Sequence, residues 1–265
     1  MNNIQPLSHD RHAGLRWRRY SDYGFATTTA LASLAAAEVG KAALALPLAF
    51  IERDGGWTLA AVMSLVPKQN LFVSREGNWL TTYVPAVFRA YPFRTGWTER
   101  AEPILCVDES SGLLVQGSEG EAFFDEAGVL SASVQQVWNF LQDTARSEAV
   151  LANACGHLHA AGVIEPWPIV IQSDAGNEQI TGLSRINEVA FNNLDDTKFG
   201  QLRRAGIVGV AYAQILSMSH LANLGELARA RAQAEAAERA KAEVKPMIAL
   251  PNDSTIDWDW SKIGR

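Results

Sequence analysis

The sequence predicts an α+β fold: an antiparallel sheet of hairpin units in the N-terminal half, a helical C-terminal half packed on it, and a protruding C-terminal helix. Three observations support this prediction. Between residues 44 and 115, short runs of apolar and aromatic residues alternate with acidic turns that contain glycine. From residue 131, apolar residues recur at helical spacing. From residue 226, the chain is rich in Ala, Glu and Arg, which favour a helix but bury little apolar surface.

The chain divides by composition into four expected segments. Residues 1–23 form an N-terminal arm, residues 24–225 a single domain, residues 226–245 a solvated helix and residues 246–265 a flexible tail. Hydrophobic residues make up 48% of the chain and charged residues 20%, as in an ordinary globular protein. A chain of this length buries roughly three-quarters of its unfolded surface, so we expect the body to fold on its own.

Three strand–turn–strand units are expected in the N-terminal half. In the first, residues 48–51 and 57–62 flank an acid followed by two glycines, which suits a tight turn with positive φ. The pattern recurs over residues 71–84 and, more loosely, over residues 104–115. Trp57 and Trp79 each follow the first turn glycine by two residues, and we expect both mainly in the core of the sheet.

Helices are expected around and after these units. Residues 26–40 predict a short helix, and Pro85 and Pro92 bracket one or two helical turns. Ser131 or Ser133 is the expected N-cap of a helix whose apolar face comprises Val134, Val137, Trp138 and Leu141. Further helices are expected over residues 147–161, between the Asp195–Asp196 cap and Gly206, and over residues 206–224, with a strand in the latter half of residues 163–171.

Charge and cysteine content exclude several classes of protein. The net charge of −6 argues against a nucleic-acid partner, because such proteins collect Lys and Arg to neutralise phosphates. Cys106 and Cys155 are too few for a disulfide framework or a four-cysteine zinc site, which favours a reducing compartment.

No secretory signal and no transmembrane segment is evident, so the expected location is the cytoplasm. Since no phosphate-binding glycine motif is present, we expect no cofactor.

Catalytic candidates are weak. Cys155 and His159 have the i, i+4 spacing of one helix face, whereas His157 points elsewhere, and no further ligand for a metal ion is evident. His220 follows Ser217 and Ser219, but neither serine lies in a nucleophile elbow. The simpler interpretation gives all of these residues structural or surface roles.

One aromatic and basic cluster remains as a candidate binding site. It comprises Arg89, Tyr91, Phe93, Arg94 and Trp97. Aromatic side chains beside arginine are typical of the energetic centre of a protein interface. In the tail, Trp258 and Trp260 alternate with acids and form a second candidate motif for a partner.

Several separated segments together resemble the bacterial SapC family. They include residues 46–50, 70–73, 77–80 and 84–93, and later residues 124–128, 182–183, 202–206 and 212–218. The family takes its name from a bacterial surface layer. Members that resemble this chain often occur near genes for TonB-dependent receptors and proteins similar to flavin-dependent tryptophan halogenases. The resemblance therefore implies a helper in nutrient uptake or peptide modification.

We expect a non-catalytic binding or accessory protein that recognises a peptide or protein partner. The C-terminal helix offers a further surface, for self-association. Two alternatives stay open: an enzyme of unrecognised type in peptide modification that uses Cys155, His157 or His159, and a structural protein associated with a surface layer.

Overall fold

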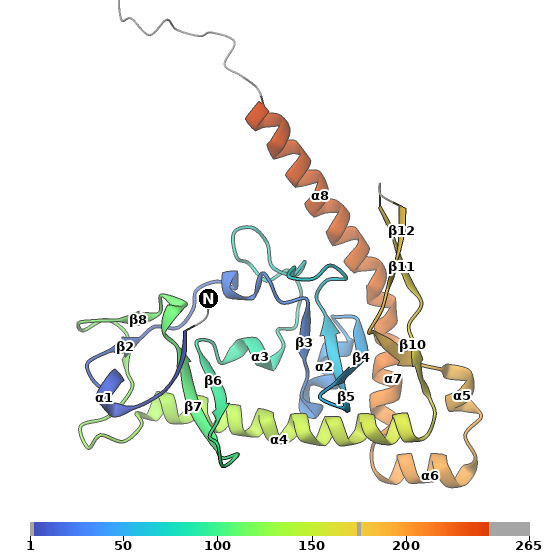
Figure 1. The fold of residues 1–265 in the computed structure, drawn as a ribbon, viewed down its shortest axis with the longest axis horizontal. Helices are drawn as coiled ribbons and strands as arrows, with labels where there is room; N and C mark the ends of the chain where they lie inside the picture. The colour runs from blue at the N-terminus through green and yellow to red at the C-terminus, as the bar shows by residue number, and fades with distance from the viewer. Residues whose placement is uncertain (1–2, 174–175, 244–265) are drawn as a thin grey trace, which may run out of the picture. The chain divides into compact units, whose positions relative to one another are not determined.

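A computed structural model describes residues 3–173 and 176–243 of the chain. It confirms the α+β class, with antiparallel sheets in the N-terminal half, a helical C-terminal half and a long C-terminal helix (Figure 1). The candidate tail residues Trp258 and Trp260 lie outside the described residues. By its internal contacts, Met1–Leu227 is one compact unit, and the residues after it fall in a second.

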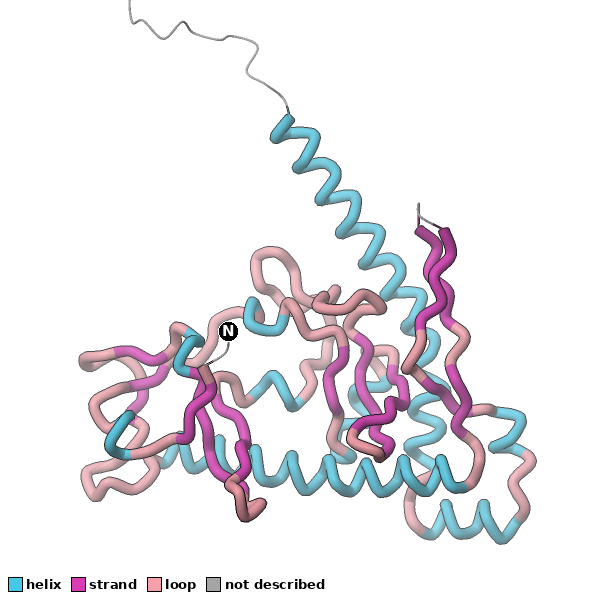
Figure 2. Tube along the Cα trace, viewed as in Figure 1, coloured by secondary structure: helices cyan, strands magenta, loops and turns pink. Residues whose placement is uncertain are grey.

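The largest sheet has five antiparallel strands in the order β10-β13-β4-β5-β3. Figure 2 colours the strands of the chain magenta and the helices cyan. Their bounds are β3 Leu31–Ser33, β4 Leu48–Arg53, β5 Gly56–Val62, β10 Ile164–Pro166 and β13 Ser184–Ile186. The central β4–β5 hairpin confirms the first predicted unit. Its turn places Asp54 and Gly55 at φ values of 52° and 75°, the left-handed region that glycine adopts without steric cost.

A second sheet of three strands has the order β1-β7-β6. Its strands are β1 Ile4–Pro6, β6 Phe93–Trp97 and β7 Pro103–Asp108. Two smaller sheets complete the strands: β8 Leu114–Val115 and β9 Glu121–Ala122 flank β2 Arg16–Trp17, and β11 Ile169–Ser173 pairs with β12 Gly176–Ile180.

Three local predictions were wrong in detail. Residues 71–84 contain an isolated bridge between Val73 and Trp79 rather than a paired hairpin. The third unit does not pair with itself, because β7 pairs with β6 and β1 while β8 pairs with β2. Residues 26–40 are not one helix but contain η1 Gly24–Ala26, strand β3, η2 Ala36–Glu38 and the start of α2 Val39–Ala43.

The helical half begins with α4, Ala132–Ala160, a single helix of 29 residues where two were predicted. Ser131, one of the two serines predicted for this position, is its N-cap, and its hydroxyl accepts a hydrogen bond of 3.4 Å from Val134 N. Asp195 likewise caps α6. The remaining helices are α1 His9–His12, α3 Ala86–Arg89, η3 Glu109–Ser111, α5 Glu188–Asn192, α6 Asp196–Arg204, α7 Val208–Ser217, η4 Met218–His220 and α8 Leu221–Glu243.

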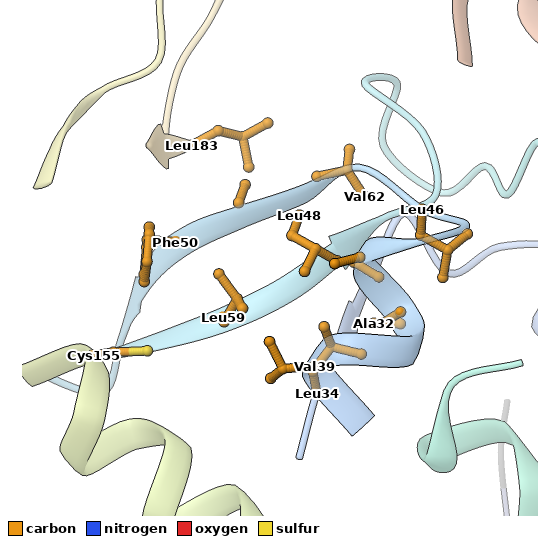
Figure 3. Packing of buried hydrophobic residues seen from close by; sticks show 14 of the residues in the cluster. Ala32, Leu34, Val39, Leu46, Leu48, Phe50, Leu59, Val62, Cys155 and Leu183 are labelled. Carbon is orange, nitrogen blue, oxygen red and sulfur yellow. The ribbon is translucent and has the colours of Figure 1, made fainter. Parts of the chain in front are cut away.

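Helix α4 contributes to two hydrophobic cores. Towards its C-terminus, Leu151, Cys155 and Leu158 join the larger core around β4 and β5. Figure 3 shows Cys155 of α4 beside the hairpin that carries Phe50 and Leu59. Towards its N-terminus, Val134 joins a smaller core under the β1-β7-β6 sheet, with Val137, Trp138 and Leu141 packed against it.

Helix α8 begins in the first unit, where Leu224 is buried in the larger core and Leu221 and Leu227 pack against it. Among residues 3–173 and 176–243, no single helix is both long and apolar enough to cross a membrane. The segments Asp196–Arg204 and Val208–Ala240 meet that criterion of length and composition only as a bent pair.

Candidate functional site

The middle of α4 lies between the two cores. Residues 142–149 belong to neither core, and they replace the large apolar residues found on either side with small and polar ones. In Figure 1, α4 crosses the β6–β7 hairpin towards one end and passes the lower ends of β3 and β5 towards the other, with α3 between. This stretch of the helix therefore has no large apolar side chain that packs into either core.

A cavity of about 370 Å³ lies over this stretch. It is bounded by β6, by the middle of α4, by the start of α3 and, from the five-stranded sheet, by Ser33 and Arg53. A cavity of about 350 Å³ adjoins it and shares Thr95, Trp97 and Ala145. A third, of about 240 Å³, shares Ala86 and Thr144. We call the three adjoining cavities the α4 groove.

One wall of the α4 groove is the outer edge of a sheet. Among the described strands, β6 is the last of its sheet, and it pairs with β7 from Phe93↔Val107 to Trp97↔Pro103. Asp108 N donates a hydrogen bond of 3.0 Å to Pro92 O, which fixes the alternation of bonded and non-bonded pairs along the ladder. The N–H and C=O groups of Thr95 therefore point away from β7, towards the open edge.

Three predicted site residues lie on β6, but in different environments. Trp97 is 63% exposed and lines the α4 groove. Arg94 is exposed and also lines it. Phe93 is 2% exposed and packs in the smaller core, edge to face against Trp17 with ring centroids 4.9 Å apart. Its role is to fix the strand in place, and Arg94 and Trp97 present the accessible side chains. The sequence pattern did not predict this strand, which the structure places at Phe93–Trp97.

The other two predicted residues lie away from β6. Tyr91 stacks on Phe25, with ring centroids 3.9 Å apart and planes at 4°, and burial raises the pKa of its hydroxyl. Arg89 lines the third cavity, where its guanidinium lies 5.6 Å from the ring centroids of both Tyr83 and Phe140. Arg89 therefore marks the far end of the groove, whereas Tyr91 faces an aromatic cluster outside it.

A buried carboxylate beside Arg89 escaped the sequence analysis. Glu38 is 4% exposed; one oxygen accepts a 2.8 Å hydrogen bond from Ala35 N, and the other accepts from Tyr83 Oη at 2.7 Å and from Ala86 N at 2.8 Å. The Arg89 guanidinium lies 3.5 Å away. Burial and the neighbouring Glu38 carboxylate raise the pKa of Tyr83. The sequence does contain a signal for Glu38, because it is the one acid in an Ala-rich apolar segment. Burying a charge in such a segment is costly unless the charge is paired.

Two charged residues of the main cavity were also missed. Arg53, at the end of β4, and Glu148, on α4, both line the main cavity. Burial raises the pKa of the Glu148 carboxyl, repulsion from Glu38 adds to the rise, and Arg53 opposes it. The main cavity thus combines positive charge on its strand side, from Arg53 and Arg94, with a partly buried carboxylate on its helix side.

The weak catalytic candidates do not assemble into a site. Cys155 is fully buried, and burial raises its pKa to about 12, so the thiol stays protonated and unreactive at neutral pH. His159 stacks on Trp57 at 4.8 Å, and His157 is exposed. Ser217 Oγ donates to Gln214 O, while His220 Nε2 lies 3.1 Å from Ala43 O. Within the part of the chain that the structure describes, no group of three or more His, Cys, Asp or Glu side chains could hold a metal ion.

Comparison with known proteins identifies the family of this chain. A family model described as SapC matches residues 7–224. The chain belongs to the SapC family. The match includes both cores, α4 and β6, so the whole α4 groove lies within the SapC region. No curated protein and no solved structure matches the chain.

Proposed function

We propose that this SapC-family protein is a non-catalytic binding protein that recognises a peptide or protein partner through the α4 groove. The observation that carries the proposal is the position of Trp97, a large aromatic side chain that is 63% exposed and lines the same cavity as Arg94. Trp and Arg are the residues most enriched at energetic centres of protein interfaces. Burial of this indole against a partner supplies a large apolar contact.

The rest of the lining favours a polypeptide over other ligands. The main cavity exposes polar and apolar surface together, and its wall includes the edge of β6 that no other described strand pairs with. The net charge of −6 and the carboxylate of Glu148 in the groove oppose a polyanion. We further propose a cytoplasmic partner that belongs to a TonB-dependent uptake or peptide-modification system; the genetic neighbourhood implied by the family resemblance supports this.

Site-specific photo-crosslinking in the cell tests the proposal. A benzophenone amino acid replaces Ala149, an exposed α4 residue that lines the groove, so that Trp97 and Arg94 stay native. A matched control carries it at Val189, which is 71% exposed on α5 and lines none of the three cavities of the groove. We expect one adduct of defined mass from position 149, lost in the Trp97→Ala and Arg94→Ala variants, and none from position 189. Adducts that are equal at both positions, or that survive both variants, would overturn the assignment.

A further inference from the structure

Resting on the proposed function, we propose a binding mode and a ligand class for the α4 groove. The ligand is an extended peptide that adds as a strand to the open edge of β6. It carries apolar side chains at alternate positions and an acidic side chain between them.

The backbone of β6 supplies the first part of this inference. An unpaired strand edge is a template for another chain, and natural proteins usually cover, shorten or charge such edges. Here the N–H and C=O groups of Thr95 point outward, and Phe93, Arg94, Thr95 and Trp97 all line the cavity on that side. Main-chain hydrogen bonds to an added strand give affinity, and pockets for alternate side chains give specificity.

The alternation of β6 supplies the second part. Successive side chains of a strand point to opposite faces, so Thr95 and Trp97 share the face of the buried Phe93, and Arg94 lies on the other. An added strand continues this alternation. Its residues on the Trp97 face enter the adjoining cavity, where Trp97, Pro103, Ala145 and Ala149 form an apolar wall. Arg146 also lines this cavity, but its charge is paired with Asp143. Those positions of the ligand should therefore be apolar.

The charges of the groove supply the third part. Arg94 is exposed, and among the described residues it makes no ion pair, so its charge is available to a ligand side chain on its own face. Cross-strand pairs of opposite charge stabilise neighbouring strands. On the α4 side, Glu148 repels a second acid. The acidic residue of the ligand is thus confined to the face of Arg94.

The test uses the full chain and a defined probe. A random heptapeptide library on phage is selected on the immobilised wild type, and one enriched peptide is synthesised with a fluorescent label. Copies of this peptide are N-methylated at one position at a time, which removes a backbone donor without changing the protein. We expect methylation at every second position to weaken binding at least about tenfold and the intervening positions to be tolerated.

Protein variants complete the design. Arg94→Glu should weaken binding at least about tenfold, and an acid-to-lysine change in the peptide should restore it. Thr95→Pro removes the edge donor at a position where an edge strand tolerates proline, and circular dichroism checks its fold. If binding depends on Trp97 but is unchanged by methylation at every position, the peptide does not add as a strand to β6. The proposed function would still stand in that case. If no enriched peptide depends on Trp97, the proposed function fails as well.

Discussion

Tyr83 donates a hydrogen bond of 2.7 Å to the carboxylate of Glu38, across 45 residues of sequence. The same carboxylate accepts from the backbone at Ala35 and Ala86. It thereby ties η2 and the segment after Tyr83 to the start of α3, which forms part of the wall of the α4 groove. One buried acid thus sets the position of backbone segments that bound the candidate site.

Replacing Glu38 should be among the most destabilising single changes in this region. Glu38→Ala leaves two backbone amides and the Tyr83 hydroxyl without their acceptor, and we expect a loss of about 3 kcal/mol in the free energy of unfolding. Tyr83→Phe removes one of the three donors and should cost about 1 kcal/mol. Urea denaturation measures both. Glu52→Ala, at an exposed acid on β4, is the matched control and should be near neutral; a comparable loss there would contradict the assignment.

Glu148 should destabilise the folded state when it is ionised. Its pKa is raised by folding, so the folded protein binds this proton more tightly than the unfolded chain does. The penalty is full above the folded pKa and absent below the unfolded value of about 4.3. We therefore expect Glu148→Gln to raise the unfolding temperature at pH 7, with the difference vanishing as the pH falls through that window. A difference that is constant with pH would show that ionisation is not its cause.

Gly96 allows β6 to approach its neighbour. A Cβ atom at this position would lie 2.5 Å from Cys106 Sγ on β7. We expect Gly96→Ala to destabilise the protein by about 1–2 kcal/mol through overpacking. In a Cys106→Ala background the sulfur is gone, and the same substitution should cost much less. Thermal unfolding of the four proteins of this cycle checks the coupling, and strictly additive effects would refute it.

Gln214 joins α7 to the central sheet. It is fully buried, its Oε1 accepts from Ile186 N at 2.9 Å, and its Nε2 donates to Leu48 O at 3.1 Å. Gln214→Leu leaves both backbone groups without this partner, and we expect a loss of about 2–3 kcal/mol. The exposed Gln201 on α6 provides the control, since Gln201→Leu breaks no buried hydrogen bond. Chemical denaturation that shows equal losses for the two variants would contradict this role.

The sequence predicted helix caps and tight turns well, because these features depend on neighbouring residues. The caps at Ser131 and Asp195 and the tight turn at Gly55 depend on residues within a few positions, and all three are confirmed. Strand pairing is different, because it depends on strands that lie far apart in the sequence. The pattern of residues 71–84 repeats that of the first hairpin, yet these residues form a single bridge. Likewise β7 pairs with β1, about 100 positions away, which no local pattern indicates.

The division of α4 into two predicted helices has a physical reason. One helix was predicted to begin at Ser131 or Ser133 and a second to cover residues 147–161, and the apolar periodicity weakens over residues 142–149. No helix-breaking residue lies there, so the helix continues, and the weak pattern instead marks the stretch that faces the α4 groove. Arg94 and Trp97 were chosen for their residue types alone. Glu38 and Glu148 were missed because their burial depends on segments far away in the sequence.

The shared helix also links the two cores energetically. Ordering the 29 residues of α4 carries a large conformational entropy cost, and packing against both cores offsets it. Unravelling either end removes part of the support for the other, so the two halves of the body should melt as one cooperative transition. A ligand in the α4 groove would touch this helix midway between them, where added rigidity reaches both halves at once.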